Sequence, residues 1–199
     1  MQTQSRRFLT PEEYLAIERG ATGKSEYYAG EMFALAGASP AHNIIAGNIF
    51  ASLHGQLRGS SCTPYVSDLR VKINALGKYT YPDVVVACDE QLFDDEQCDT
   101  LLNPTVIIEV LSEGTEAYDR GRKFEHYRRI DSLRQYLLVS QECRRIEEYF
   151  REDDDEWSLS EAFGLGSFVT LPSIGCELVL EDVYDKVDLP VTADDLLGL

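Results

Sequence analysis

Two short apolar runs constrain the fold of this chain more than any other feature. Residues 84–87 follow directly after Tyr81-Pro82-Asp83, and residues 106–111 carry a carboxylate, Glu109, in their middle. Short runs rich in Val and Ile that are bounded by Pro, Asp and Asn are typical of β-strands. A glutamate inside such a strand is costly to bury alone. We therefore expect a metal ion or a nearby cation to face Glu109.

Helix signals precede these strands. Thr10-Pro11 has the form of a capped helix start, with an end expected at Gly20. Ser39-Pro40 repeats the signal and predicts a second helix. Its apolar face recurs every four residues: Ile45, Ile49, Leu53 and Leu57. Between the two helices, residues 26–35 predict two short strands folded about Gly30.

The remaining pattern is mostly β-structure. Residues 65–73 alternate and predict one strand, in which Leu69, Val71 and Ile73 face inward while Arg70 and its neighbours need only local pairing. A turn at 74–77 should lead into a returning strand near Tyr79. A helix is expected from Asp119 to Tyr127, with further strands and a short closing helix at 135–139, 146–150, 157–159, 168–180 and 180–184. This order predicts a mixed α/β (α+β) fold with a central mixed β-sheet flanked by helices.

Composition narrows the class of protein. With 199 residues, 44% of them apolar, one compact domain over residues 1–190 is expected, followed by an acidic, flexible tail at 191–199. No apolar segment resembles a signal peptide or a membrane span, which predicts a cytoplasmic protein. The five cysteines form no CxxC pair, so reduced thiols are expected. The net charge of −17 argues against generic binding of polyanions.

Asp83 and Glu109 lie at the start and in the middle of two apolar strands. Two carboxylates on adjacent strands, together with a lysine, can hold a hard divalent cation against a phosphodiester. By strand alternation Glu109 shares a face with Ile107 and Leu111. The alternative is a structural cap at Asp83 and a buried Glu109 that is paired with an arginine.

Other candidates also have ordinary explanations. Glu26 could be an edge-strand charge, and His42 a solvated or capping histidine in the first turn of its helix. Helical spacing places Asp119, Lys123 and Tyr127 on one face, where Asp119 and Lys123 could form a plain surface pair and Tyr127 could serve packing alone.

A wider set of motifs carries a family resemblance. Pro82-Asp83 followed by Glu109-Val110-Leu111 resembles the PD-(D/E)XK motif of restriction-endonuclease-like nucleases. Residues 26–31, Pro40 with His42, and the run from Asp119 to Lys123 with Tyr127 are similar to the Uma-type endonucleases of that superfamily. The likeness extends over roughly residues 8–190. The superfamily's usual lysine lies two residues after the glutamate, where this chain has Leu111, and the resemblance implies that Lys123 replaces it.

The resemblance implies a DNA endonuclease that depends on Mg²⁺ or Mn²⁺. Asp83, Glu109 and the carbonyl of Val110 would bind the metal, Lys123 would orient the attacking water, and Glu26 would help to hold the site. The candidate DNA contacts are Arg120, Arg122, Arg128, His42 and Tyr127. The resemblance also favours a homodimer, since cutting both strands of a duplex needs two sites related by symmetry.

The distribution of charge bears on two possible functions, a DNA endonuclease and a module that binds a protein partner. Eight of the 18 Lys and Arg residues lie between Arg120 and Arg145, so a local basic surface could dock a phosphate backbone on an acidic protein. The alternative is a catalytically silent nuclease fold that binds a protein partner through its acidic surface. An intact set of Asp83, Glu109 and Lys123 favours the enzyme.

Overall fold

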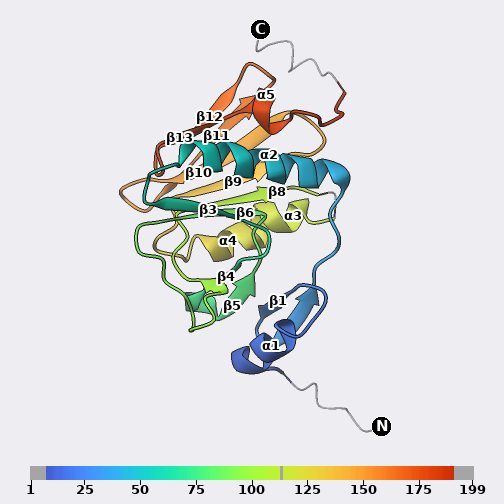
Figure 1. Ribbon diagram of the computed structural model, residues 1–199, viewed down its shortest axis with the longest axis vertical. Coiled ribbons are helices and arrows are strands. Elements are labelled where there is room, and N and C mark those ends of the chain that lie inside the picture. The colour runs from blue at the N-terminus through green and yellow to red at the C-terminus, as the bar shows by residue number, and fades with distance from the viewer. Residues whose placement is uncertain (1–7, 113, 191–199) are drawn as a thin grey trace.

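A computed structural model describes residues 8–112 and 114–190 (Figure 1). Its centre is a six-stranded mixed sheet in the order β11-β10-β9-β8-β6-β3. The bounds of these strands are β3 Cys62–Val66, β6 Val84–Cys88, β8 Val106–Val110, β9 Gln135–Val139, β10 Arg145–Arg151 and β11 Trp157–Phe163. Only β8 and β9 run parallel among these neighbours; the other pairs are antiparallel. The prediction of a central mixed sheet flanked by helices is confirmed.

The two faces of this sheet bury different partners. Alternate residues of β6 and β8, among them Val84, Val86 and Ile108, pack with the apolar face of α2 (Pro40–Gln56). The opposite residues, such as Val85 and Ile107, pack with a second sheet and the segment around Tyr127. Burial on both faces explains why these strands read as continuous apolar runs instead of alternating ones.

The second sheet has five strands in the order β2-β1-β5-β4-β7. Its strands are β1 Ser25–Tyr28, β2 Glu31–Ala34, β4 Arg70–Ile73, β5 Lys78–Thr80 and β7 Thr100–Leu101. The β1–β2 hairpin turns at Gly30, whose φ of 86° suits glycine. A Cβ there would lie 2.6 Å from the Cβ of Phe8, so the close approach of the chain also requires glycine.

Short helices complete the fold. α1 (Pro11–Glu18) begins with the expected capping box, in which Thr10 and Glu13 bond each other's backbone N–H. A helical segment below the central sheet consists of α3 (Glu116–Tyr118), the π-helical turn η2 (Asp119–Lys123) and α4 (Phe124–Tyr127). The other elements are the 3-10 turn η1 (Asn74–Leu76), the hairpin of β12 (Phe168–Leu171) and β13 (Cys176–Val179), and α5 (Leu180–Val183).

The single strand expected at 65–73 is wrong. The chain bends between Val66 and Arg70, where Ser67 has a φ of 36°, so that β3 joins the six-stranded sheet and β4 the five-stranded one. Arg70 is not an outward residue with local pairing: it is buried and forms an ion pair with Asp99, far along the chain. The second sheet forms because this bend carries the chain out of the first.

The expectation of reduced thiols is also wrong for two cysteines. Cys62 and Cys88 are register partners in the β3–β6 ladder and form a disulfide, with Cα atoms 3.9 Å apart. Cys98, Cys143 and Cys176 are free. Sequence spacing could not show this pair, because it depends on which strands are neighbours.

Within residues 8–112 and 114–190, no helix is long and apolar enough to cross a membrane. The acidic tail expected at 191–199 lies outside the described residues.

Candidate active site

Asp83 lies where β6 meets β8. These strands pair antiparallel with Val84 opposite Ile108, so Asp83 comes next to Glu109 at the end of this ladder. Asp83 Oδ2 accepts a hydrogen bond of 2.8 Å from the backbone N–H of Val110, and His42 Nε2 lies 3.1 Å from the same oxygen. His42 is held in the first turn of α2, whose N-cap Ser39 accepts from the His42 N–H. Asp83 therefore does act as a local structural anchor while facing the site.

Glu109 points away from α2, on the face shared with Ile107 and Leu111, as strand alternation predicted. It is 3% exposed. Its partner is Lys123, with Nζ 2.9 Å from Oε1, and not an arginine. Tyr127, which is fully buried, donates a hydrogen bond of 2.8 Å to the same oxygen. Tyr127 thus combines packing with a direct bond to the candidate carboxylate.

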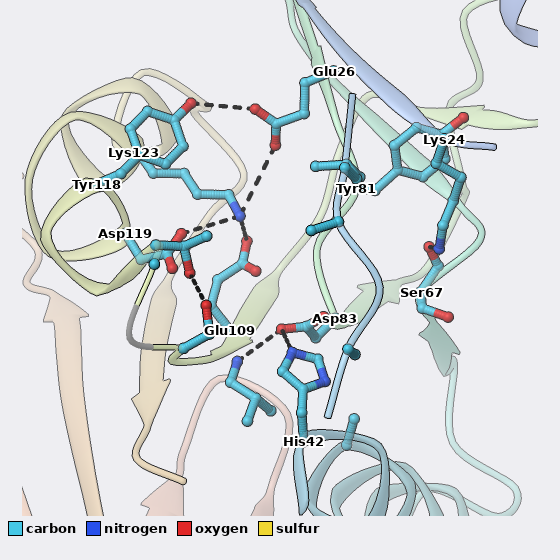
Figure 2. Close-up of a pocket in the computed structure, with 18 of the residues that line it drawn as sticks. Lys24, Glu26, His42, Ser67, Tyr81, Asp83, Glu109, Tyr118, Asp119 and Lys123 are labelled. Atoms are coloured by element: carbon cyan, nitrogen blue, oxygen red, sulfur yellow. Dashed lines mark hydrogen bonds and ion pairs between the residues drawn. The ribbon is translucent and has the colours of Figure 1, made fainter. Parts of the chain in front are cut away.

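Lys123 is surrounded by three carboxylates. Besides Glu109, Asp119 Oδ1 lies 3.3 Å and Glu26 Oε1 4.0 Å from its Nζ (Figure 2). Lys123 is only 7% exposed and Asp119 is buried, so they do not form the plain surface pair that helical spacing allowed. Asp119 and Lys123 bound the π-helical turn, a local deviation that is frequent at functional sites.

Glu26 is a buried member of the same cluster rather than an edge-strand charge. It reaches the site because β1 pairs with β5, which places Thr80 and Lys78 beside it. Thr80 Oγ1 donates to Glu26 Oε1, Tyr118 donates to Oε2 at 3.2 Å, and Lys78 Nζ lies 3.5 Å from Oε2. Lys78 is itself buried and lies over the ring of Tyr118, 5.0 Å from its centroid.

Burial and neighbouring charges shift the pKa values of these groups in different directions. Burial raises the pKa of Glu109 to about 8; Lys123 opposes the rise and Asp83 adds to it. Burial alone would lower the pKa of Lys123, but Glu109, Asp119 and Glu26 outweigh it and hold that pKa well above its usual value. Burial likewise would raise the pKa of Glu26, yet Lys123 and Lys78 keep it below its usual value. Glu109 therefore takes up a proton more readily than Glu26, while Lys123 stays charged.

The cluster carries an excess of negative charge. Four carboxylates (Asp83, Glu109, Asp119, Glu26) face two buried ammonium groups (Lys123, Lys78), which leaves two negative charges when all are ionised. Among the described residues, no group of three or more His, Cys, Asp or Glu side chains has the arrangement of a protein-only metal site. Mg²⁺ needs only one or two carboxylates, because it keeps several waters. The donor set and its excess charge fit one hard divalent cation.

These groups line a cavity of about 1180 Å³. One wall comes from the β1–β2 hairpin and the connection to α2, the other from the helical segment 116–127 (Figure 2). Of the eight cations expected between residues 120 and 145 to form a basic surface, only Arg122 and Lys123 line it within the described part of the chain. Arg120 lies elsewhere, paired with Glu116 and Glu147, and Arg128 is exposed outside the cavity.

Sequence reasoning missed Lys78 and Tyr118. A lysine at the start of a hairpin strand normally lies in solvent, and no local pattern marks this one as buried. The segment Lys78-Tyr79-Thr80 does alternate, which could have placed Lys78 and Thr80 on one face.

Comparisons with known proteins agree with this architecture. The model of the Uma2 family, described as "Putative restriction endonuclease", matches residues 11–181. Two proteins of Synechocystis sp. (strain PCC 6803) are similar: the uncharacterized protein sll1609 is 39% identical over 79% of this chain and 89% of its own length. The uncharacterized protein slr1290 is 36% identical over 88% of this chain and 91% of its own length.

A solved structure shares the fold. The crystal structure from Anabaena variabilis of a "putative nuclease belonging to DUF820" superposes with a TM-score of 0.73 at 17% identity. The match covers 89% of this chain and 98% of that one.

Proposed function

This chain belongs to the Uma2 family, and from that premise we propose that it is a metal-dependent nuclease that hydrolyses phosphodiester bonds of DNA in the cavity around Lys123. The observation that carries the proposal is one buried ammonium, Lys123 Nζ, within 2.9–4.0 Å of three carboxylates that come from three separate segments. A fold has no structural need to bury so many charges together, since apolar residues of similar volume are often as stable. A module that only binds a protein partner through its surface would gain nothing from this cluster.

Asp83, Glu109 and the carbonyl of Val110 would hold Mg²⁺ or Mn²⁺. When bound, the ion would polarise a phosphoryl oxygen and make a coordinated water more acidic. In the hydrolysis itself, the oxygen of water bonds to phosphorus and the bond from phosphorus to one ester oxygen breaks. One proton of the water ends on the departing oxygen, and the other stays with the oxygen that is now bonded to phosphorus.

Lys123 stabilises the charge that develops on the phosphoryl group and orients the attacking water. Its ammonium is a compact donor with three N–H bonds, so it can stay paired with Glu109 and Asp119 while one N–H turns to the substrate. Glu26, held by Thr80, Tyr118 and Lys78, keeps Lys123 in place from the opposite side. Arg122, exposed on the same wall, is available to a neighbouring phosphate.

The proposal is tested by nicking of supercoiled plasmid with Mg²⁺ or Mn²⁺. A chelator, which removes the divalent metal, is the negative control. Lys123→Met should lower the rate on the order of a hundred- to a thousand-fold, as is typical for one lost electrostatic contact in a transition state. Glu181→Gln, an exposed carboxylate of α5, is the matched control and should cut like the wild type. Wild-type protein that never nicks DNA with either metal would overturn the nuclease assignment.

Metal binding is tested separately by calorimetric titration with Mn²⁺. Asp83→Asn and Glu109→Gln should each weaken binding by at least about tenfold, because each removes a charged ligand. Equal affinity in the wild type and both variants would remove the metal site from the proposal.

The proposed enzyme is a homodimer, since two-fold symmetry is the commonest arrangement of soluble oligomers and would give each DNA strand its own cavity. Light scattering at working concentration tests this, and a mass of one protomer would refute it.

A further inference from the structure

Exposed apolar side chains gather at the mouth of the cavity. Phe33 is 49% exposed and Tyr118 36% exposed, and both line it. Leu35 and Val66, also exposed, lie on the same rim. Large apolar side chains left in water at the edge of a cleft mark a binding site.

The aromatic rim is continuous with the charged cluster. Phe33 and Glu26 are register partners in the β1–β2 ladder, so their side chains leave the same face of the hairpin. Tyr118 donates its hydroxyl proton to Glu26 from the opposite wall. The cavity that holds Lys123 therefore has one aromatic ring on the hairpin and one on the helical segment, each close to Glu26.

The lysine and arginine side chains that line the cavity do not favour binding of double-stranded DNA. Affinity for double-stranded DNA rises with the number of phosphates that Lys and Arg neutralise. Lys24 is paired with Asp68, Lys78 with Glu26, and Lys123 with Glu109. Among the described residues that line the cavity, Arg122 is the one Lys or Arg for which no ion pair is found. A duplex also hides its base faces from Phe33 and Tyr118.

An unpaired DNA strand suits both the exposed aromatic rings and the small number of unpaired cations at the cavity. Its bases expose π-faces, which stack on aromatic side chains largely independently of the base sequence. Its affinity also depends less steeply on the number of neutralised phosphates than that of a duplex. The reacting groups are recessed, because Glu109 and Lys123 are both buried at the bottom of the cavity. A flexible single strand can bring a phosphate to that depth.

We propose that the cavity takes single-stranded or locally unpaired DNA. One base stacks on Phe33, another on Tyr118, and the phosphate between them lies at Lys123 while Arg122 contacts the next one. This assignment of the substrate rests on the proposed nuclease function.

The test uses full-length protein and fluorescein-labelled oligonucleotides of one sequence in three forms: single strand, full duplex, and duplex with a central unpaired stretch. Wild-type protein should cut the single strand and the unpaired stretch at least about tenfold faster than the full duplex. Phe33→Ala should lower kcat/KM for the single strand roughly five- to a hundredfold, the usual effect of losing one stacked base. Phe33→Trp keeps a stacking surface and should retain the activity.

Phe168→Ala is the matched control. Phe168 is 56% exposed on β12 and does not belong to the described lining of the cavity, so its removal should leave cleavage unchanged. Circular dichroism of all variants separates a loss of contact from a loss of fold. Equal cleavage of the duplex and the single strand, or a folded Phe33→Ala variant as active as the wild type, would overturn the inference and leave the nuclease function standing.

Fluorescence anisotropy of the same oligonucleotides distinguishes the two proposals. Binding of the single strand that depends on Phe33, without cleavage of any form, would support the unpaired-strand site and refute the nuclease function. Failure to bind the single strand would refute the site itself.

Discussion

Removing the charge of Lys123 should destabilise the whole fold, not only an activity. The change is Lys123→Met, which keeps most of the side-chain stem and deletes the ammonium. Three carboxylates lie within 2.9–4.0 Å of that ammonium, and all three are buried. Without it, Glu109 and Asp119 lose their direct ion-pair partner.

The magnitude follows from burial. Breaking a buried ion pair typically costs about 3–5 kcal/mol, because an uncompensated charge remains. Glu109 limits the loss, since a carboxyl with a pKa of about 8 can take up a proton instead of staying charged. We expect the free energy of unfolding to fall by about 3 kcal/mol. For a chain of this size the melting temperature should then fall by roughly 6–12 °C.

The assay is unfolding by urea and by heat, without divalent metal. Unfolding is monitored by the fluorescence of Trp157, the sole tryptophan. Its ring lies edge-on to that of Phe124, with the ring centroids 5.3 Å apart. Phe124 directly follows Lys123 in the chain. Lys186→Met, at a lysine whose side chain is 84% exposed, is the control and should change stability by less than about 0.5 kcal/mol. Adding Glu109→Gln to Lys123→Met should recover part of the loss. A Lys123→Met midpoint equal to that of the wild type would refute the reasoning that the ammonium holds the buried carboxylates.

Three further predictions concern the scaffold. Asp99→Asn, which removes bonds from Arg19 and Arg70, should lower stability by about 1–2 kcal/mol at pH 7. Arg19 holds the pKa of Asp99 below its usual 3.8, so this stabilisation is present above that value and the difference from the wild type should vanish as pH falls below it in pH-dependent melts. Thiol titration of unfolded, unreduced protein should find three thiols, and five after reduction; five before reduction would rule out the Cys62–Cys88 bond. Gly30→Ala should destabilise by about 1–3 kcal/mol in urea melts, because its φ of 86° and the contact with Phe8 exclude a Cβ, and an unchanged midpoint would contradict that geometry.

Local pattern was sufficient for much of the fold. The capping box at Thr10, the hairpin at Gly30 and the apolar face of α2 are each determined by residues within a few positions of one another, and all three form as predicted. The approach of Asp83 to Glu109 was also predictable, because apolar strands that follow one another in the chain tend to pair.

The sequence by itself therefore determined most of the elements, the mixed central sheet and the face to which Glu109 points. Only the tertiary structure decided that Glu26 and Lys78 are buried beside Lys123, since that follows from the pairing of β1 with β5 and the packing of the helical segment 116–127 against both sheets. The same holds for the bend between β3 and β4 and for the disulfide, which depends on the register of β3 with β6. Whether a charged side chain is buried is set by the neighbours that long-range pairing brings to it, and a local pattern holds no information about those neighbours.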